Sequence, residues 1–292
     1  MYKPNINTIK ISENDQSRSN FIRSFVQSTP SSFMSIPESI NTIPKTIVQF
    51  WDDTDNLPWD VKECIDSWNY FEDKGYEQIL FNEYTARQFI TEKFTIEHVE
   101  AFKRCYHPAM KSDYFRLCFI LSKGGLYVDV DDTYNGFNIE HLFEDNRLKL
   151  QPLCYDIETD MMIEPDIFMN PINYSSKWIF YFNNNPLMAS SGNPVIEYAL
   201  QRATKILLET DPNDFPEIQS TTGPGNLTAS IVVNMGDSKL FKKDNNFLIL
   251  SDWETYAQTI WNLSYRQDSR NWRLSNQKEF SQKIKPSDEG RS

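Results

Sequence analysis

The sequence predicts an α/β fold, in which a mostly parallel sheet is surrounded by helices. Predicted strands and helices alternate from residue 43 onward, which is the pattern of such sheets. A short apolar run at residues 126–128 follows a long amphipathic helix and leads directly into acids. With 292 residues, 39% of them hydrophobic, the chain is also long enough to bury a large core. In this fold class, nucleotides bind in a crevice at the strand ends.

The first strand is expected at residues 43–51, where an extended β-branched run ends in two aromatic residues. Elements of both kinds follow it. In chain order we expect a helix at 61–70 opened by Pro58, a strand at 76–81, helices at 84–93 and 95–104, a short helix at 139–143, a strand at 148–155, a strand and loop at 177–193, a helix at 194–208, a turn opening a helix at 222–228, and a strand at 247–250.

The helix before the apolar run is predicted to begin at Pro108 and to end before Gly124-Gly125. Proline suits the first turn of a helix, and glycine can adopt the left-handed conformation that ends one. Apolar residues recur along one face at spacings of three and four, at Met110, Tyr114, Leu117, Cys118 and Leu121. The pattern therefore predicts an amphipathic helix.

Three acids in four residues follow the apolar run, at Asp129, Asp131 and Asp132. Because a strand alternates its faces, Asp129 and Asp131 are expected to point the same way at the strand end. Two such carboxylates repel each other, and a divalent cation relieves the repulsion. A few oxygen ligands suit Mg²⁺ or Mn²⁺ that also binds a substrate diphosphate. A solvated acidic turn is the alternative, whereas an EF-hand loop fails in both possible registers.

A second pair of charged residues lies on the preceding helix, where Asp113 and Arg116 are three residues apart and share a face. An acid at this place suits the hydroxyls of a ribose or a sugar, and a guanidinium suits phosphate. A surface ion pair is the alternative for these two residues taken alone. Their combination with the acids downstream favours a functional site.

The ordered string Ser112-Asp113-x-x-Arg116, followed by Gly124-Gly125-x-Tyr127-x-Asp129-x-Asp131, resembles the core of the DXD-motif sugar transferases, glycosyltransferase family 32. That family includes initiating mannosyltransferases and capsular polysaccharide transferases, and a related fold occurs in the large clostridial glucosylating toxins. The resemblance implies a GT-A (Rossmann-like) nucleotide-sugar transferase fold with helical additions. It extends more weakly from Ile43 to about Trp272.

The resemblance also implies roles for single residues. The residues expected to be catalytic are Asp113, Arg116, Asp129 and Asp131. Those expected to bind the donor are Trp51, Ser112, Asp113, Arg116, Tyr127 and Asp129. The expected metal ligands are Asp129, Asp131 and Asn262, the last standing about where the family has a histidine.

The implied reaction is metal-dependent, retaining transfer of a sugar from a nucleotide-diphosphate donor, with Mn²⁺ or Mg²⁺ as the cofactor. A UDP-sugar is favoured over GDP-mannose as the donor, and the expected acceptor is a glycan, a lipid-linked saccharide or a protein. Two alternatives stay open. A metal-dependent nucleotidyl or phosphoryl transferase also needs paired carboxylates, and a noncatalytic nucleotide- or carbohydrate-binding module on a transferase scaffold is suggested by Asn262.

Composition and charge lead to expectations about domain organisation, nucleic-acid binding, localisation and the cysteines. We expect an N-terminal extension at 1–42 with a short helix at 20–27, a transferase domain at 43–275 and a flexible tail at 276–292. The net charge of −12 argues against nonspecific nucleic-acid binding. The lack of a long apolar run or signal-like start predicts a cytoplasmic protein, with possible peripheral association at the inner face of the membrane. The four cysteines lack CxxC spacing and are expected to be free.

Overall fold

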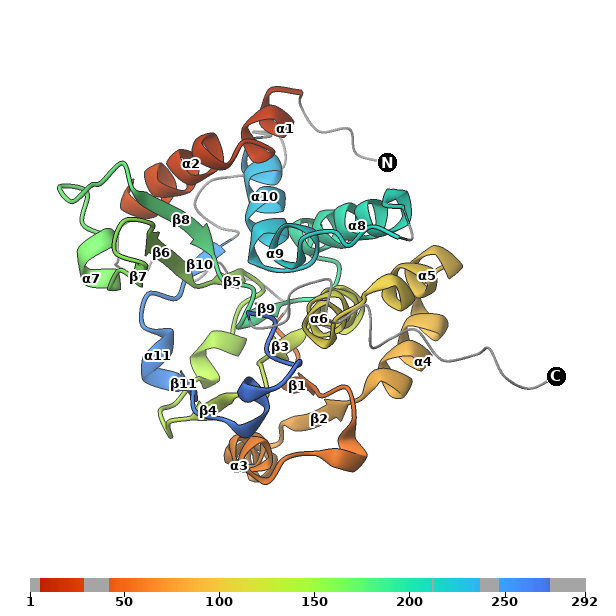
Figure 1. Ribbon diagram of the computed structural model, residues 1–292. Coiled ribbons are helices and arrows are strands. Elements are labelled where there is room, and N and C mark those ends of the chain that lie inside the picture. Colours follow the sequence, from red (N-terminus) through yellow and green to blue (C-terminus); the bar gives the residue numbers. More distant parts are fainter. Residues whose placement is uncertain (1–5, 29–41, 212, 237–246, 274–292) are drawn as a thin grey trace.

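A computed structural model describes residues 6–28, 42–211, 213–236 and 247–273. It confirms the predicted α/β class, because a parallel-rich central sheet is surrounded by helices (Figure 1). Within the described residues the sheet has six strands, in the spatial order β10 (Phe247–Ile249), β5 (Leu148–Leu150), β9 (Leu187–Ala189), β3 (Gly125–Tyr127), β1 (Thr46–Phe50) and β2 (Glu77–Phe81). Strand β1 runs parallel to β2 and β3, whereas β9 is antiparallel to β3 and β5. The predicted tail at 276–292 lies outside the described residues.

The helices agree with most of the predicted ranges. They are α1 (Ile6–Ser12), α2 (Asp15–Ser28), α3 (Trp59–Ser67), α4 (Glu83–Lys93), α5 (Ile96–Arg104), α6 (Pro108–Lys123), α7 (Pro165–Phe168), α8 (Pro194–Glu209), α9 (Ile218–Thr221), α10 (Pro224–Met235) and α11 (Trp253–Tyr256). Short 3₁₀ helices are η1 (Thr54–Asn56), η2 (Trp68–Lys74), η3 (Glu140–Phe143) and η4 (Ser264–Gln267). The predicted helix at 61–70 is thus divided between α3 and η2, and the one at 139–143 is a 3₁₀ helix.

Helix α6 lies at the centre of the molecule, where it contacts β3, β9, α4 and α8. It begins at Pro108, as predicted, and the side chain of His107 caps it by accepting a hydrogen bond from the amide of Ala109 at 3.0 Å. Its apolar residues belong to the largest hydrophobic core, and Tyr114 and Phe115 are fully buried. This burial against the sheet and α8 holds the helix beside the carboxyl end of β3.

The end of α6 differs from the prediction. Gly124 has a φ of 74° but a ψ of −176°, so the predicted left-handed cap is wrong. Glycine is needed at both positions because the backbone of other segments passes close to them. A Cβ atom on Gly124 would lie 2.8 Å from the amide nitrogen of Ser191, and one on Gly125 would lie 2.8 Å from the carbonyl oxygen of Thr46.

The acids do not extend the strand. Strand β3 ends at Tyr127, and residues 128–131 form a turn into β4 (Asp132–Tyr134). The turn is closed by a hydrogen bond from the amide of Asp132 to the carbonyl oxygen of Asp129 at 3.1 Å. The expectation that strand alternation directs Asp129 and Asp131 to one face is therefore wrong, because neither residue lies in a strand. Strand β4 pairs with β11 (Ala257–Thr259), which brings the C-terminal segment to the turn.

A smaller sheet lies beside the central one and has the order β7 (Met161–Met162), β6 (Pro152–Asp156) and β8 (Trp178–Phe182). Figure 1 shows α2, in red, running along β8. The apolar residues Ile22 and Val26 of α2 are buried in the main core, and Ser19 accepts a hydrogen bond from the amide of Phe180 at 3.0 Å. Helix α2 is longer than the predicted 20–27, and the domain boundary at residue 42 stays a prediction.

Two further expectations concern membrane-spanning helices and the cysteines. Across the described residues, every helix is too short or too polar to cross a membrane. Cys64, Cys105, Cys118 and Cys154 are free and buried, as predicted. Burial raises the pKa of the Cys105 and Cys118 thiols, so they pack as apolar groups.

Candidate active site

A cavity of about 750 Å³ opens beside the turn that follows β3. Its lining includes the first turns of α6, the end of β1, the turn 129–132, the loop 183–185 before β9, and residues 265–266 and 270–273. Most of the predicted site residues line it together, namely Trp51, Ser112, Asp113, Arg116, Asp129 and Asp131. The packing of α6 against β3 thus brings two separate sequence motifs to one cavity.

Two predicted residues lie elsewhere. Tyr127 is fully buried behind the cavity wall, where its hydroxyl is hydrogen-bonded to that of Ser112 at 2.7 Å. Its ring lies 4.4 Å from the guanidinium of Arg116, so Tyr127 supports cavity residues instead of facing a ligand. Asn262 is exposed and is not among the residues that line the cavity. The structure therefore does not bring the predicted third metal ligand to Asp129 and Asp131.

Arg116 is the most tightly held cation of the site, with 3% of its side chain exposed. Its Nη2 lies 3.1 Å from Oδ1 of Asp113 and donates to Oδ1 of Asp129 at 2.8 Å, while its Nη1 donates to the carbonyl oxygen of Asn184 at 2.7 Å. The pair formed with Asp113 is therefore buried, and the alternative of a surface ion pair is excluded. One guanidinium joins α6 to the acidic turn.

Asp113 lies deep in the cavity wall between two polar side chains. It accepts hydrogen bonds from the amide nitrogen of Asn184 at 2.8 Å and from the hydroxyl of Thr222 at 3.3 Å. Burial raises the pKa of Asp113, against the attraction of Arg116. Gly223, the residue before α10, packs close to this carboxylate, because a Cβ atom there would lie 3.2 Å from Oδ2 of Asp113.

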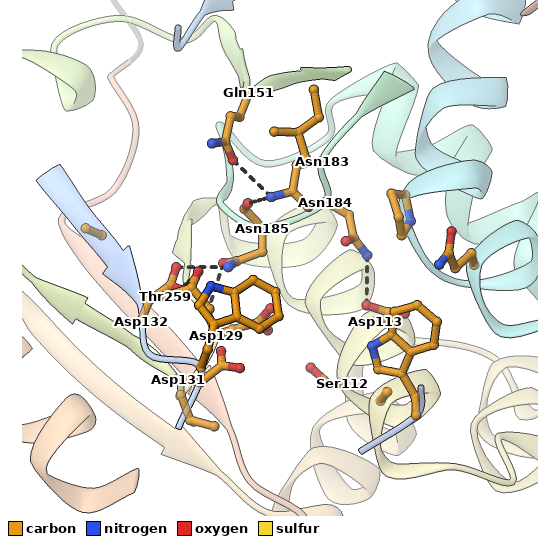
Figure 2. Close-up of a pocket in the computed structure, with 18 of the residues that line it drawn as sticks. Ser112, Asp113, Asp129, Asp131, Asp132, Gln151, Asn183, Asn184, Asn185 and Thr259 are labelled. Carbon is orange, nitrogen blue, oxygen red and sulfur yellow. Dashed lines mark hydrogen bonds between the residues drawn. The ribbon is translucent and has the colours of Figure 1, made fainter. Parts of the chain in front are cut away.

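Asp131 and Asp132 are held by side chains from β11, η4 and the loop before β9. Oδ2 of Asp131 accepts a hydrogen bond from the hydroxyl of Tyr265 at 2.7 Å and forms an ion pair with Arg266. Oδ1 of Asp132 accepts from the hydroxyl of Thr259 at 2.7 Å, and its Oδ2 accepts from the amide of Asn185 at 2.9 Å (Figure 2). The turn is thus held by residues more than fifty positions away in the sequence.

The crowding of acids changes their protonation. Burial, followed by repulsion from Asp131, raises the pKa of Asp129 to about 6 although Arg116 opposes the change. Burial and repulsion from Asp131 and Asp129 raise the pKa of Asp132 to about 7. Carboxylates in such an environment favour a bound cation, which relieves both their desolvation and their repulsion.

The donor set of the turn fits a divalent ion that also binds substrate phosphates. Among the described residues, no group of three or more His, Cys, Asp or Glu side chains is arranged as a complete metal site. In the part of the chain that the structure describes, Oδ2 of Asp129 and Oδ1 of Asp131 have no hydrogen-bond partner. Two carboxylates suffice for Mg²⁺ or Mn²⁺ when water and a diphosphate complete the coordination.

Trp51 forms one wall of the cavity at the carboxyl end of β1. Its ring is 5% exposed and meets the ring of Tyr265 edge to face at 5.3 Å, and the guanidinium of Arg270 lies 5.3 Å from it. Its indole Nε1 is buried and has no hydrogen-bond partner within the described part of the chain. Buried polar groups are usually hydrogen-bonded, so this unpaired donor makes Trp51 a candidate ligand contact.

Sequence reasoning missed the polar residues that hold the acids in place. Figure 2 shows Gln151 and Asn183 to Asn185 gathered above the acidic turn and Asp113. Asn183 donates to Oε1 of Gln151 at 2.9 Å, and the next two asparagines bind Asp113, Asp129 and Asp132. The signal in the sequence was the run of three asparagines before Pro186, because amides in a row between two short strands suit the binding of carboxylates.

Comparison with known proteins finds one matching protein family and similar solved structures. The model of the capsular polysaccharide synthesis protein family matches residues 1–151, a stretch that contains α6 and the acidic turn. Among solved structures, the chain is similar to one described as PaToxG Glycosyltransferase, with a TM-score of 0.41 and 15% sequence identity over 92% of this chain and 96% of that chain. No curated protein matches the sequence.

Proposed function

We propose a function on the premise that the chain belongs to the capsular polysaccharide synthesis protein family. The chain is a glycosyltransferase that acts in polysaccharide biosynthesis and moves a sugar from a nucleotide-diphosphate donor to an acceptor. The observation that carries the proposal is the meeting of Asp113, Arg116, Asp129 and Asp131 in one cavity. A cavity of about 750 Å³ has room for a nucleotide sugar.

Each part of the donor has a suitable group in the cavity. The base is proposed to lie against Trp51, whose Nε1 is an unused donor within the described residues. The diphosphate is proposed to lie near Arg116, which holds a fixed positive charge at the acidic turn. Asp113, which faces the cavity beside Asn184, is proposed to accept hydrogen bonds from hydroxyls of the transferred sugar or the ribose.

A divalent ion, Mn²⁺ or Mg²⁺, is part of the proposal. Asp129 and Asp131 would hold it, Asp131 directly and Asp129 directly or through water. Such an ion neutralises charge that develops on a leaving diphosphate. Arg116 would add to this neutralisation. Its position does not depend on the ion, because it forms an ion pair with Asp113 and donates hydrogen bonds to Asp129 and to the carbonyl oxygen of Asn184.

The finer identity of the reaction is also proposed. We assign the chain to the DXD-motif type of glycosyltransferase family 32, with retention of anomeric configuration and a UDP-sugar favoured over GDP-mannose. The acceptor is a glycan, a lipid-linked saccharide or a protein. No catalytic base is assigned, because the resemblance implies front-face attack, for which no protein nucleophile is firmly assigned.

The test is a panel of UDP- and GDP-sugars, incubated with the protein and Mn²⁺ or with a chelator. Release of free nucleotide is measured, together with the shift in melting temperature that each donor causes. Cleavage of one donor, only with metal, is the expected result and names the sugar. No cleavage and no thermal shift with any donor would contradict the proposal, and release of pyrophosphate would indicate nucleotidyl transfer instead.

A further inference from the structure

Arg266 occupies the carboxylate that the proposed ion needs. Its Nη2 forms an ion pair with Oδ2 of Asp131, and the two side chains are only 13% and 12% exposed. The hydroxyl of Tyr265 donates to the same oxygen at 2.7 Å. A divalent ion binding to Asp131 therefore competes with a guanidinium that is already neutralising it.

Two arginines form ion pairs with the acidic turn, and they are held very differently. Arg116 contacts two carboxylates, a hydroxyl and a carbonyl oxygen, so it has no freedom to leave the acidic turn. Arg266 has a single carboxylate partner, Asp131, in the described part of the chain, and its Nε is buried without a hydrogen-bond partner there. The rest of its guanidinium lies against the rings of Trp261 at 4.5 Å and Tyr265 at 5.6 Å. Ring faces hold a cation without fixing its direction.

The backbone that carries Arg266 is anchored independently of this ion pair. Leu263 is buried in a small core with Trp51 and Val61. Ser264 donates from its amide and its hydroxyl to the carboxylate of Asp60, at 2.6 and 3.0 Å. The guanidinium of Arg266 is therefore free to change partners by side-chain rotation while the segment around it stays in place.

Two of the three carboxylates of the turn are paired with arginines. Arg116 faces Asp129, and Arg266 faces Asp131. A divalent ion alone would add two positive charges to this arrangement, and a diphosphate alone would add about two negative ones. The ion and the diphosphate together leave the net charge unchanged, and Asp131 is available to the ion if Arg266 moves from this carboxylate to the phosphates.

We infer that Arg266 is an exchangeable counterion: it neutralises Asp131 in the free protein and moves to the donor diphosphate when a divalent ion takes Asp131. The ion and the nucleotide therefore bind cooperatively, and each alone binds weakly. This inference rests on the proposed function, since it assumes a metal and a diphosphate in the same cavity. Arg266 also becomes a donor-binding residue that lies outside the motif of residues 112–131.

The test measures binding, with Mn²⁺ and UDP as the probes. Free Mn²⁺ is followed by electron paramagnetic resonance in titrations of the wild type, Arg266→Gln and the control Lys205→Gln, each with and without UDP. Lys205 is 70% exposed on α8, so its variant loses the same single charge far from the cavity. All three proteins are first compared by circular dichroism and thermal melting.

We expect UDP to tighten Mn²⁺ binding to the wild type and to Lys205→Gln by about tenfold or more, whereas Arg266→Gln binds Mn²⁺ alone about tenfold more tightly than the wild type and responds less to UDP. An unchanged or weaker affinity of Arg266→Gln for Mn²⁺ alone would overturn the inference. If that variant does not fold, the wild type still decides, because independent binding of Mn²⁺ and UDP contradicts the exchange. Failure of the wild type to bind UDP with Mn²⁺ or to cleave any donor would instead count against the proposed function.

Discussion

Asn185 donates a hydrogen bond from its side-chain amide to Oδ2 of Asp132 at 2.9 Å, across 53 positions of the sequence. The carbonyl oxygen of the same side chain accepts a hydrogen bond from the backbone amide of Asp129 at 2.9 Å. One buried side chain thus holds both ends of the acidic turn. The conformation of the turn depends on the loop before β9 as much as on β3.

Replacement of Asn185 by alanine should loosen the turn. Two hydrogen bonds in a buried site are lost, and a buried backbone amide and a carboxylate lose a partner, so unfolding free energy should fall by about 1–3 kcal/mol. Turnover of the donor should fall by roughly tenfold or more, because Asp129 and Asp132 lose their common support. Asn173→Ala is the control, since its side-chain amide donates a hydrogen bond to the carbonyl oxygen of Ile167 at the surface. Equal turnover in both variants would show that Asn185 does not position the acids.

Asp131→Asn should abolish sugar transfer while the melting temperature stays within a few degrees of the wild type. An amide can still accept a hydrogen bond from Tyr265, but it neither neutralises Arg266 nor binds a hard cation well. Asp66→Asn, which removes an exposed acid paired with Lys62, should retain activity. Donor hydrolysis with Mn²⁺ checks both variants, and full turnover by Asp131→Asn without metal would refute the mechanism.

Above neutral pH, the free energy of unfolding should depend on the protonation of Lys149, which is fully buried and paired with Asp145. Burial lowers the pKa of Lys149 to about 8, although Asp145 opposes the change. Between that value and its ordinary pKa of 10.5, the unfolded chain binds more protons at this residue than the folded one, so the residue's contribution to stability rises with pH. Wild type should therefore gain stability relative to Lys149→Met from pH 8 to pH 10. Denaturant unfolding at several pH values measures the difference, and the exposed variant Lys205→Met should follow the wild type; a constant difference between wild type and Lys149→Met contradicts the prediction.

Gly125→Ala should be strongly destabilising. Gly125 has a φ of 118°, and an added Cβ would lie 2.8 Å from the carbonyl oxygen of Thr46 in the neighbouring strand. Gly136 also has a positive φ, of 86°, but nothing lies within 4 Å of an added Cβ there. Gly136→Ala should thus cost only the conformational term of about 1–2 kcal/mol, and Gly125→Ala roughly 2 kcal/mol more. Equal midpoints of urea unfolding would refute the steric explanation.

The sequence by itself determined the central helix, the short strand after it and the approach of two motifs to one site. Spacings of three and four define the buried face of α6, and glycines followed by an apolar run define β3. These are local properties, because backbone geometry sets the period of a helix and the length of a strand. A strand that follows directly on a helix also leaves Arg116 close to the residues after the strand, which is why Arg116 and Asp129 meet.

Tertiary structure alone decided how the acids are directed and what binds them. Strand alternation failed for Asp129 and Asp131 because the chain turns at residue 128 to let β4 pair with β11. The asparagine loop and Arg266 reach the turn from elements more than fifty and more than one hundred residues away. Asn262 lies at the surface although the preceding residue, Trp261, lines the cavity. Contacts over such separations result from the packing of several elements at once, and no local pattern of residues records that packing.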